Sequence, residues 1–467
     1  MIITTLKSWF FRFAFAVSLV FVFQLVSITG FAQSKFNHDY SQTLVMKIGI
    51  SVPDQKGGTK IINTFEDALE IIKKTDNLSL GVPKIIYLVG WQYNGHDDKY
   101  PAFFEVNKAL KRSQDNSARE SLVWLMTEAR KYHTTVSLHI NMTDAYEDSP
   151  LWDEYVNNDL ISKTASGNLM VIGNYNNRKA YQINYKNVWN SGYAQKRIDR
   201  LLELLPPLKD AGTIHIDAWI VRDSKGHYES AVTEAVYQKK ILNYWKEKGL
   251  DVTSEWVMDY MVGFVPFAWH FNYMTQEDYL RIPAYVYTGS GLNPDVRGTD
   301  FGLGFLFGKS MYGETVFPGL HNGTRVDKWE SLFVDDFYSN CLQYFYLNKL
   351  KRLKVEGEGD NRIAYFSDNV KVSLADSTVT KGGCLLRKKD FVAFPVAWGK
   401  EKMLAVYSKT GGTKLIQIPT DWGNVKKVSV SLIHSSGVVF QKNSTVLHNQ
   451  FNINLEAGKP CLIEIKE

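Results

Sequence analysis

The stretch "GTIHIDAW", residues 212–219, decides how the fold is interpreted. As a β-strand it places Ile214 and Ile216 on one face and His215 and Asp217 on the other, because successive side chains of a strand point to opposite sides. One face suits burial against apolar neighbours, while the other carries an imidazole and a carboxylate. The stretch therefore predicts a sheet that is covered on one side and lines a polar pocket on the other.

Two further stretches repeat this alternation. "TTVSLHIN", residues 134–141, ends with His139 and Asn141 on its polar face, and "DVTSEW", residues 251–256, carries Glu255 on its polar face. In a βα barrel the outward faces pack against helices, so the polar faces point inward and their last members lie at the C-terminal mouth, where barrel active sites are built. For any one strand alone, a half-solvated antiparallel strand remains an alternative interpretation.

Strand-like runs alternate with helical patterns from about Gln42 to Leu350. The strand-like runs cover residues 43–52, 83–91, 134–141, 212–219 and 251–256, and the helical patterns cover 62–74, 118–133, 193–211 and 232–249. This alternation predicts βαβ units and a parallel sheet. The length of the span favours an α/β fold of the (β/α)8 TIM-barrel type. The sequence does not place strands six to eight between Pro266 and Phe317.

The stretch "LKVEGEGDNR", residues 353–362, has the charge and glycine content of a domain boundary. Beyond it, short strand-like runs separated by turn signals predict an antiparallel β-sandwich. The expected organisation is a barrel catalytic domain over residues 40–354 and a β-sandwich domain over residues 360–467. Glycan binding and capping of the barrel are both open as roles for the sandwich.

The N-terminus has the pattern of a secretory leader. Lys7 and Arg12 precede an apolar run that ends in small residues at Gly30 and Ala32. This pattern predicts a signal peptide over residues 1–32, a secreted or periplasmic mature protein and no membrane span after cleavage. An uncleaved anchor is the alternative, because the apolar run approaches the length of a transmembrane helix.

Charge and cysteine content narrow the possible partners. Without residues 1–32 the formal net charge falls from +5 to +3, which is too weak and too evenly spread to suggest nucleic acid. Cys341, Cys384 and Cys461 fit neither a disulfide framework nor a zinc site. A single bridge between Cys384 and Cys461 and isolated buried thiols are both open. There is also no nucleophile elbow, zincin helix or phosphate loop, so no metal ligand and no cofactor is assigned.

Asp217 and Glu255 are the candidate catalytic pair. They would end adjacent barrel strands and face each other, and a separation of about 5–5.5 Å suits a retaining glycosidase. One carboxylate would attack the anomeric carbon, while the other would protonate the leaving oxygen and later deprotonate water. Carboxylates at barrel mouths also bind magnesium or act as general acids and bases. The residues by themselves therefore favour a barrel hydrolase.

Four stretches taken in order carry a resemblance to a known family. "VGWQYNGHDDKYPAF" (89–103), "LHINMTDAYEDSP" (138–150), "IHIDAW" (214–219) and "SEW" (254–256) resemble the catalytic domain of glycoside hydrolase family 101, the endo-α-N-acetylgalactosaminidases. Related exo-acting α-N-acetylgalactosaminidases carry the same motifs. The likeness covers roughly residues 84–270.

The resemblance implies roles for individual residues. Asp217 would be the nucleophile and Glu255 the general acid/base of a retaining mechanism. His96 and Asp97 would bind sugar hydroxyls, and Asn141 would line the same subsite. A loop-stabilising pair is the alternative for His96 and Asp97, and capping of its own loop is the alternative for Asn141.

Three further residues are expected near the substrate. His139 and His215 lie on the inward faces of their strands, and Trp219 follows Asp217 on the same face, where it would form a wall against the sugar or pack in the core. The sequence departs from the family in the charged stretch after Asp217 and in Val257 after the E-W motif. Family members are also typically larger, so the aglycone and the sugar are open.

The predicted function is that of a secreted retaining glycosidase for α-linked N-acetylgalactosamine in mucin-type O-glycans, with a glycan or glycopeptide as substrate and no cofactor. One alternative is an exo-acting α-glycosidase for another α-galactoside-type sugar. The other is a glycan-binding protein without turnover. Endo or exo action, calcium dependence and oligomeric state do not follow from the sequence.

Overall fold

The computed structural model describes residues 36–54, 56–175, 177–270, 274–289, 301–311, 317, 328–399 and 402–466. The predicted leader, residues 1–32, lies outside the described residues. The chain divides into Met1–Phe36 and a compact unit, Asn37–Glu467, which is the unit described below. Among the described residues, no helix has the length and apolar character that a membrane crossing requires.

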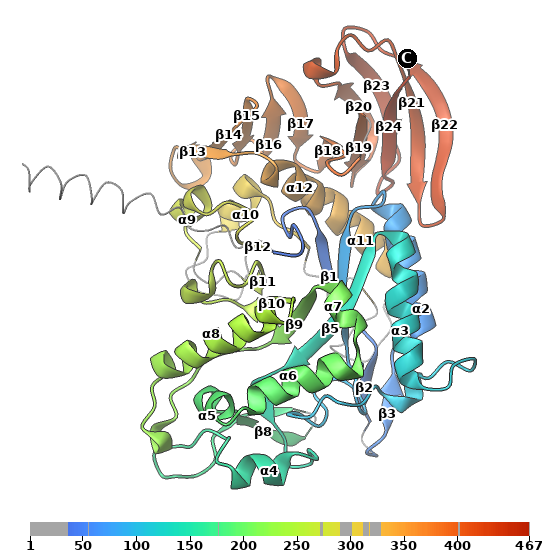
Figure 1. Cartoon of the computed structure of the whole chain (residues 1–467). Coiled ribbons are helices and arrows are strands. Elements are labelled where there is room, and N and C mark those ends of the chain that lie inside the picture. The colour runs from blue at the N-terminus through green and yellow to red at the C-terminus, as the bar shows by residue number, and fades with distance from the viewer. Residues whose placement is uncertain are drawn as a thin grey trace, which may run out of the picture. The chain divides into compact units, whose positions relative to one another are not determined.

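A seven-stranded parallel sheet forms the first part of this unit (Figure 1). Its strands, in sheet order, are β1 (Leu44–Gly49), β4 (Lys84–Val89), β5 (Thr134–Asn141), β9 (Thr213–Asp217), β10 (Asp251–Trp256), β11 (Phe267–His270) and β12 (Thr288–Gly289). Every neighbouring pair is parallel, and the order in the sheet follows the order in the chain. The predicted parallel α/β architecture is confirmed for these strands, while closure into an eight-stranded barrel stays a prediction.

Helices alternate with these strands. They are α2 (Phe65–Leu78), α3 (Ala118–Glu128), α4 (Trp152–Asn157), α5 (Tyr185–Asn190), α6 (Tyr193–Leu204), α7 (Pro207–Ala211), α8 (Ala231–Glu247), α9 (Gln276–Arg281), α10 (Phe301–Phe307), α11 (Trp329–Asp336) and α12 (Leu342–Asn348). Helix α2 begins after Thr64, whose hydroxyl accepts a hydrogen bond from the Asp67 backbone N–H while the Asp67 carboxylate accepts one from Thr64. This reciprocal cap satisfies donors that the first helical turn leaves free.

The two faces of the sheet differ as the alternation predicts. Ile214 and Ile216 of β9 belong to one apolar core together with residues of α2, α3, α6 and α8. On the other face, the Tyr87 hydroxyl lies 2.6 Å from Thr213 Oγ1. His215 Nδ1 lies 2.9 Å from Thr253 Oγ1 of the next strand. The polar face is therefore an interior in which strands of the sheet provide hydrogen-bond partners for one another's side chains.

Two small sheets extend the loops of the parallel sheet. One joins β2 (Ser51–Pro53) and β3 (Thr59–Ile61), and the other has the order β6 (Asp144–Ala145), β8 (Arg178–Gln182), β7 (Val171–Tyr175). Strand β6 follows β5 directly. The second small sheet therefore lies at the C-terminal end of β5.

The C-terminal region is antiparallel and rich in β-structure (Figure 1). A ten-stranded sheet has the order β13 (Arg352–Glu356), β14 (Ile363–Phe366), β15 (Val370–Ser373), β16 (Thr378–Lys381), β17 (Cys384–Lys388), β18 (Phe391–Pro395), β19 (Met403–Ser408), β24 (Cys461–Lys466), β21 (Lys427–His434), β22 (Gly437–Thr445). A second sheet pairs β20 (Gly412–Gln417) with β23 (Gln450–Leu455). Both sheets contribute to one apolar cluster, in which Ile416 and Ile453 of the small sheet join Leu404 and Val430 of the large one.

The three cysteines do not form disulfides. Cys341, Cys384 and Cys461 are free thiols, and all three are buried. Of the two open alternatives, the structure has isolated buried thiols. The domain limits 40–354 and 360–467 stay predictions.

Candidate active site

Asp217 is the last residue of β9 and lies beside β5, where its register partner is Asn141. Its two carboxylate oxygens have different neighbours: Lys47 Nζ lies 3.9 Å from Oδ1, and His139 Nε2 lies 3.5 Å from Oδ2. Burial alone would raise the pKa of Asp217, but the charge and hydrogen bond of His139, with the charges of Lys47 and His96, hold it well below its ordinary value. Asp217 is therefore an ionised carboxylate, and its side chain keeps 16% of its surface exposed.

Glu255 lies beside Asp217 at the same end of the sheet. Strands β9 and β10 pair in parallel with Ser254 opposite Ile216, so Asp217 and Glu255 are the next residues along two neighbouring strands. Neighbouring strands lie about 4.8 Å apart. Glu255 is half-buried and shares the inward face of β10 with Thr253, which contacts His215. The structure places the two residues side by side at the ends of neighbouring strands, and their catalytic roles stay a prediction.

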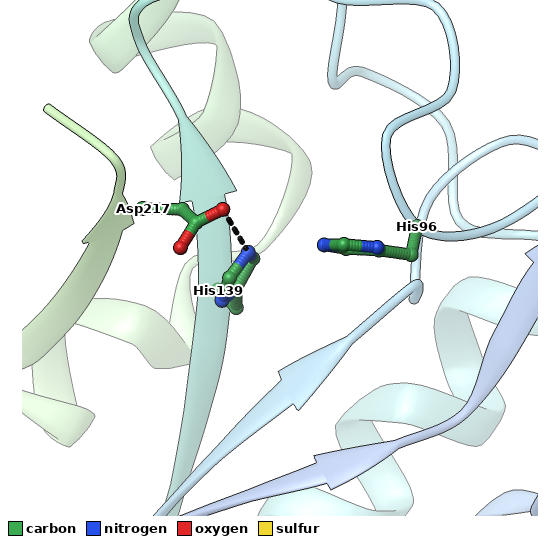
Figure 2. Close-up of side chains that lie close together, drawn as sticks. All are labelled: His96, His139 and Asp217. Atoms are coloured by element: carbon green, nitrogen blue, oxygen red, sulfur yellow. Dashed lines mark ion pairs between the residues drawn. The ribbon is translucent and has the colours of Figure 1, made fainter. Parts of the chain in front are cut away.

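His96 and Asp97 belong to the loop after β4. The His96 ring points toward His139 and Asp217 (Figure 2), and its centroid lies 5.4 Å from that of His139. His96 Nε2 lies 3.6 Å from Asp97 Oδ1. Burial raises the pKa of Asp97, the charge of His96 opposes this, and the charge of Asp217 adds to it. His96 faces the Asp217 carboxylate and also contacts Asp97, and the substrate-binding role of the pair stays a prediction.

Gly95 explains why this loop can approach the sheet so closely. Its φ is +130°, and a Cβ at this position would lie 2.6 Å from the Val52 Cα. The next residue donates its backbone N–H to the Ser51 carbonyl at 2.9 Å. A glycine before His96 therefore allows the backbone of the loop to pack against β2, and this contact fixes the position of the His96 backbone.

Asn141 holds its own loop. Its Nδ2 donates to Asp144 Oδ2 at 2.9 Å, and its Oδ1 accepts from the backbone N–H groups of Thr143 and Asp144 at 2.7 and 2.9 Å. The side chain is buried. These bonds correspond to the capping alternative, and a sugar contact by Asn141 stays a prediction.

The two strand histidines lie at different depths. His139 contacts Asp217 directly. His215 is fully buried between the rings of His139 and Trp269, with centroid distances of 5.3 and 4.7 Å. His215 therefore lies below the carboxylate and supports His139 through ring packing.

Trp219 lies in the core. It is only 1% exposed, its ring centroid lies 6.2 Å from that of Tyr185 in an edge-on arrangement, and its backbone carbonyl accepts a hydrogen bond from Gln238 Nε2. These contacts correspond to the core alternative. A wall against the sugar would need a more exposed ring.

Two residues at the site were not singled out from the sequence. Lys47 contacts Asp217, and its signal was an inward-facing lysine within the apolar run "LVMKIGI". Asp144, within the quoted acidic loop, accepts hydrogen bonds from Asn141 and from the Tyr146 hydroxyl. Burial, followed by the charges of Asp97 and Asp217, raises the pKa of Asp144 to about 8.

Asp144 makes stability depend on pH in a predictable direction. Its pKa in the folded protein, about 8, exceeds the unfolded value of about 3.9. As pH rises from about 4 to 8, the unfolded chain releases this proton while the folded protein retains it, so stability falls through this window. At about 1.4 kcal/mol per pH unit the effect reaches several kcal/mol. Asp144→Asn cannot titrate, so we expect its melting temperature to rise relative to wild type between pH 5 and pH 8. If the melting temperatures of the two proteins change with pH in the same way, the raised pKa of Asp144 is contradicted.

His96, His139 and Asp217 also form a set of possible metal ligands. One ligand atom from each lies within 4.8 Å of the others. Zinc bonds of about 2.1 Å in tetrahedral geometry place neighbouring ligand atoms about 3.4 Å apart. The set would have to contract before it could hold such an ion, and the Lys47 ammonium already contacts the same carboxylate. As it stands, the arrangement is that of a carboxylate flanked by cationic and imidazole groups.

Comparison with known proteins decides the family. The sequence profile of glycoside hydrolase family 101, described as endo-alpha-N-acetylgalactosaminidase, matches residues 37–277, which is more than half of the chain. The chain belongs to glycoside hydrolase family 101. The resemblance expected from the quoted motifs is thereby confirmed. The match includes Asp217, Glu255, His96 and Lys47. No curated protein sequence matches the chain.

Solved structures are similar to this family 101 chain in fold. Alpha-N-acetylgalactosaminidase NagBb from Bifidobacterium bifidum, in its GalNAc complex, has 13% sequence identity and a TM-score of 0.52 over 74% of this chain and 58% of that chain. The ligand-free form has 14% identity and a TM-score of 0.52 over 73% and 58%. The chain therefore spans less than two thirds of the length of these structures, and identity this low shows similarity of fold alone.

Proposed function

We propose that the protein is a retaining glycosidase that cleaves α-linked N-acetylgalactosamine, with Asp217 as nucleophile and Glu255 as general acid/base. The observation that carries the proposal is an ionised carboxylate at the end of β9, directly beside the C-terminal end of β10, where Glu255 lies. Membership of glycoside hydrolase family 101 supports the reaction class and the sugar.

The first half of the reaction uses both carboxyl groups. Asp217 attacks the anomeric carbon while Glu255 gives its proton to the glycosidic oxygen, so the bond to the aglycone breaks as the bond to Asp217 forms. Charge develops on the sugar in an oxocarbenium-like transition state. The product is a β-linked glycosyl ester on Asp217 and a free aglycone.

The second half releases the sugar. Glu255, now a carboxylate, takes a proton from water, and the water oxygen bonds to the anomeric carbon while the electron pair of the ester bond returns to Asp217. Two inversions give net retention. This sequence needs the two carboxyl groups about 5–5.5 Å apart, which the spacing of neighbouring strands supports.

The residues around Asp217 fall into those that face its carboxylate and those that are buried behind it. His96 and Asp97 face Asp217 from the loop after β4 and are proposed to bind sugar hydroxyls. His139 would orient the Asp217 carboxylate, to which it lies at 3.5 Å. Asn141 and His215 are nearly or fully buried, so we propose that they, with Trp219, shape the site from behind and reach the sugar less directly.

Further parts of the proposal concern the chain as a whole. We propose that the seven described strands belong to a (β/α)8 barrel followed by a β-sandwich domain, and that residues 1–32 direct secretion. Mucin-type O-glycans or glycopeptides are the proposed substrates. The basic and apolar composition of residues 1–32 supports the leader.

The test follows the configuration of the released sugar. Purified protein is incubated with an aryl α-N-acetylgalactosaminide, and the first-formed anomer is recorded by proton NMR before mutarotation. We expect the α-anomer to form first. Early formation of the β-anomer would contradict retention, and calorimetric binding without release would favour a glycan-binding protein. Release from mucin glycopeptides, as monosaccharide or disaccharide, then distinguishes exo from endo action.

A further inference from the structure

Lys47 is a buried lysine in the middle of β1, a strand whose residues are all buried. Its side chain has no exposed surface, and its neighbours Met46 and Ile48 point into the apolar core on the other face of β1. Removing an ammonium group from water is costly unless charged or polar groups compensate for it. A lysine at this position therefore needs a specific reason.

Asp217 and Trp269 are among the groups that lie against the Lys47 ammonium. Asp217 Oδ1 lies 3.9 Å from Nζ, and the ring centroid of Trp269 lies 4.9 Å from Nζ. Trp269 is itself buried, and an indole face stabilises a desolvated cation. The ammonium thus lies between an aromatic face and a carboxylate oxygen of Asp217.

The Asp217 carboxylate is flanked from both sides, since Lys47 lies at Oδ1 and His139 at Oδ2. We propose that Lys47 is a positioning residue that fixes the orientation and charge of Asp217 and stabilises this carboxylate when it leaves the sugar. The inference rests on the proposed function, because it assigns Lys47 a role in the reaction of Asp217. Lys47 acts through Asp217 and needs no contact with the substrate.

The charge on Asp217 changes twice in each turnover. Forming the ester removes the negative charge, and the Lys47 cation then remains against Trp269. When water attacks, the electron pair of the ester bond returns to the carboxylate, and a fixed positive charge at 3.9 Å lowers the energy of this developing anion. In the first step the same charge stabilises the attacking carboxylate itself. Loss of Lys47 should therefore slow the second step more than the first.

Charged and titratable groups surround Asp217 on several elements. They include Lys47 on β1, His96, Asp97 and Tyr100 after β4, His139 on β5, Asp144 after β5, Tyr175 at the end of β7 and Glu255 on β10. An opposite charge within about 4–6 Å lowers a carboxyl pKa by about 1–3 units. Removing Lys47 takes away one of the charges that lower the pKa of Asp217, so the acidic limb of the pH–rate profile should move to higher pH.

The test compares Lys47→Met with Lys84→Met in the full-length protein. Lys84 is the matched control: it is equally buried, it lies at the first residue of the neighbouring strand β4, and it pairs with Asp76 at the opposite end of the sheet. With an aryl α-N-acetylgalactosaminide, we expect Lys47→Met to move the acidic limb of kcat/KM up by about one pH unit or more. We also expect a product burst and a kcat reduced roughly 10-fold. Lys84→Met should keep the wild-type limb and show no burst.

Two further variants keep the inference testable if Lys47→Met does not fold. Lys47→Gln removes the charge but retains polar atoms, so it should reproduce both the shifted acidic limb of kcat/KM and the product burst. Lys47→Arg keeps the charge and should show the wild-type acidic limb. A wild-type acidic limb without a burst in a folded Lys47→Gln or Lys47→Met protein would overturn the inference. If Asp217→Asn keeps full turnover, the proposed function itself fails, so the two failures are distinguishable.

Discussion

Asp217→Asn should abolish turnover of aryl α-N-acetylgalactosaminides, with kcat reduced roughly 10⁴-fold or more. The amide has the shape of the carboxylate but lacks the charge and the nucleophilic oxygen that form the glycosyl ester. Steady-state release of the aryl group measures the loss. Asp210→Asn is the control: this carboxylate lies in α7, just before the same strand, and is 71% exposed, so its loss should leave kcat unchanged.

Chemical rescue by azide shows whether a variant is inactive because it has lost the nucleophile or for another reason. Asp217→Gly leaves space beside the anomeric carbon, where azide can attack in place of the carboxylate. We expect azide to restore aryl release and to give the β-glycosyl azide, because only one inversion takes place. Both variants leave the buried Lys47 cation without Asp217, which costs stability. Rates should therefore be compared below the melting temperature of each variant. Wild-type turnover by Asp217→Asn would refute the assignment.

The fold could be predicted where the two faces of a strand differ in polarity. Strands β5 and β9 alternate between apolar side chains that meet helices and polar side chains that face the interior, so their direction and burial follow from sequence. The later strands could not be placed from the sequence because they are too short to show such an alternation. Strand β11 is only Phe267–His270 and β12 is only Thr288–Gly289, and such short stretches carry no periodic signal.

The candidate site could be predicted where chemistry and topology coincide. Asp217 and Glu255 are one βα step apart, and a parallel sheet places the ends of consecutive strands side by side. Lys47 was missed because a lysine in a strand usually lies at the surface, and its partner Asp217 is distant in sequence. Trp219 shows another limit: the chain leaves the extended conformation at Ala218, whose φ is +39°, so the alternation of β9 no longer says which way Trp219 points.

Glu255→Gln should have an effect that depends on the leaving group. A serine- or threonine-linked sugar needs its glycosidic oxygen protonated as the bond breaks, so we expect kcat/KM for a glycopeptide to fall roughly 10³-fold. A dinitrophenyl α-glycoside needs no proton on its leaving oxygen. Its kcat/KM, which reports the first step, should therefore stay within about 10-fold of wild type.

Hydrolysis of the glycosyl ester, the second step of the reaction, tests the role of Glu255 independently. With the dinitrophenyl substrate, Glu255→Gln should accumulate the ester on Asp217, because no carboxylate remains to deprotonate water, and kcat should fall well below that of wild type. Azide needs no general base, so it should raise kcat and give the α-glycosyl azide, the anomer opposite to that expected from Asp217→Gly. Glu247→Gln, an exposed carboxylate at the end of α8, is the control that should behave as wild type. Equal losses on both substrates, with no effect of azide, would mean that another group donates the proton and that Glu255 serves the structure of β10.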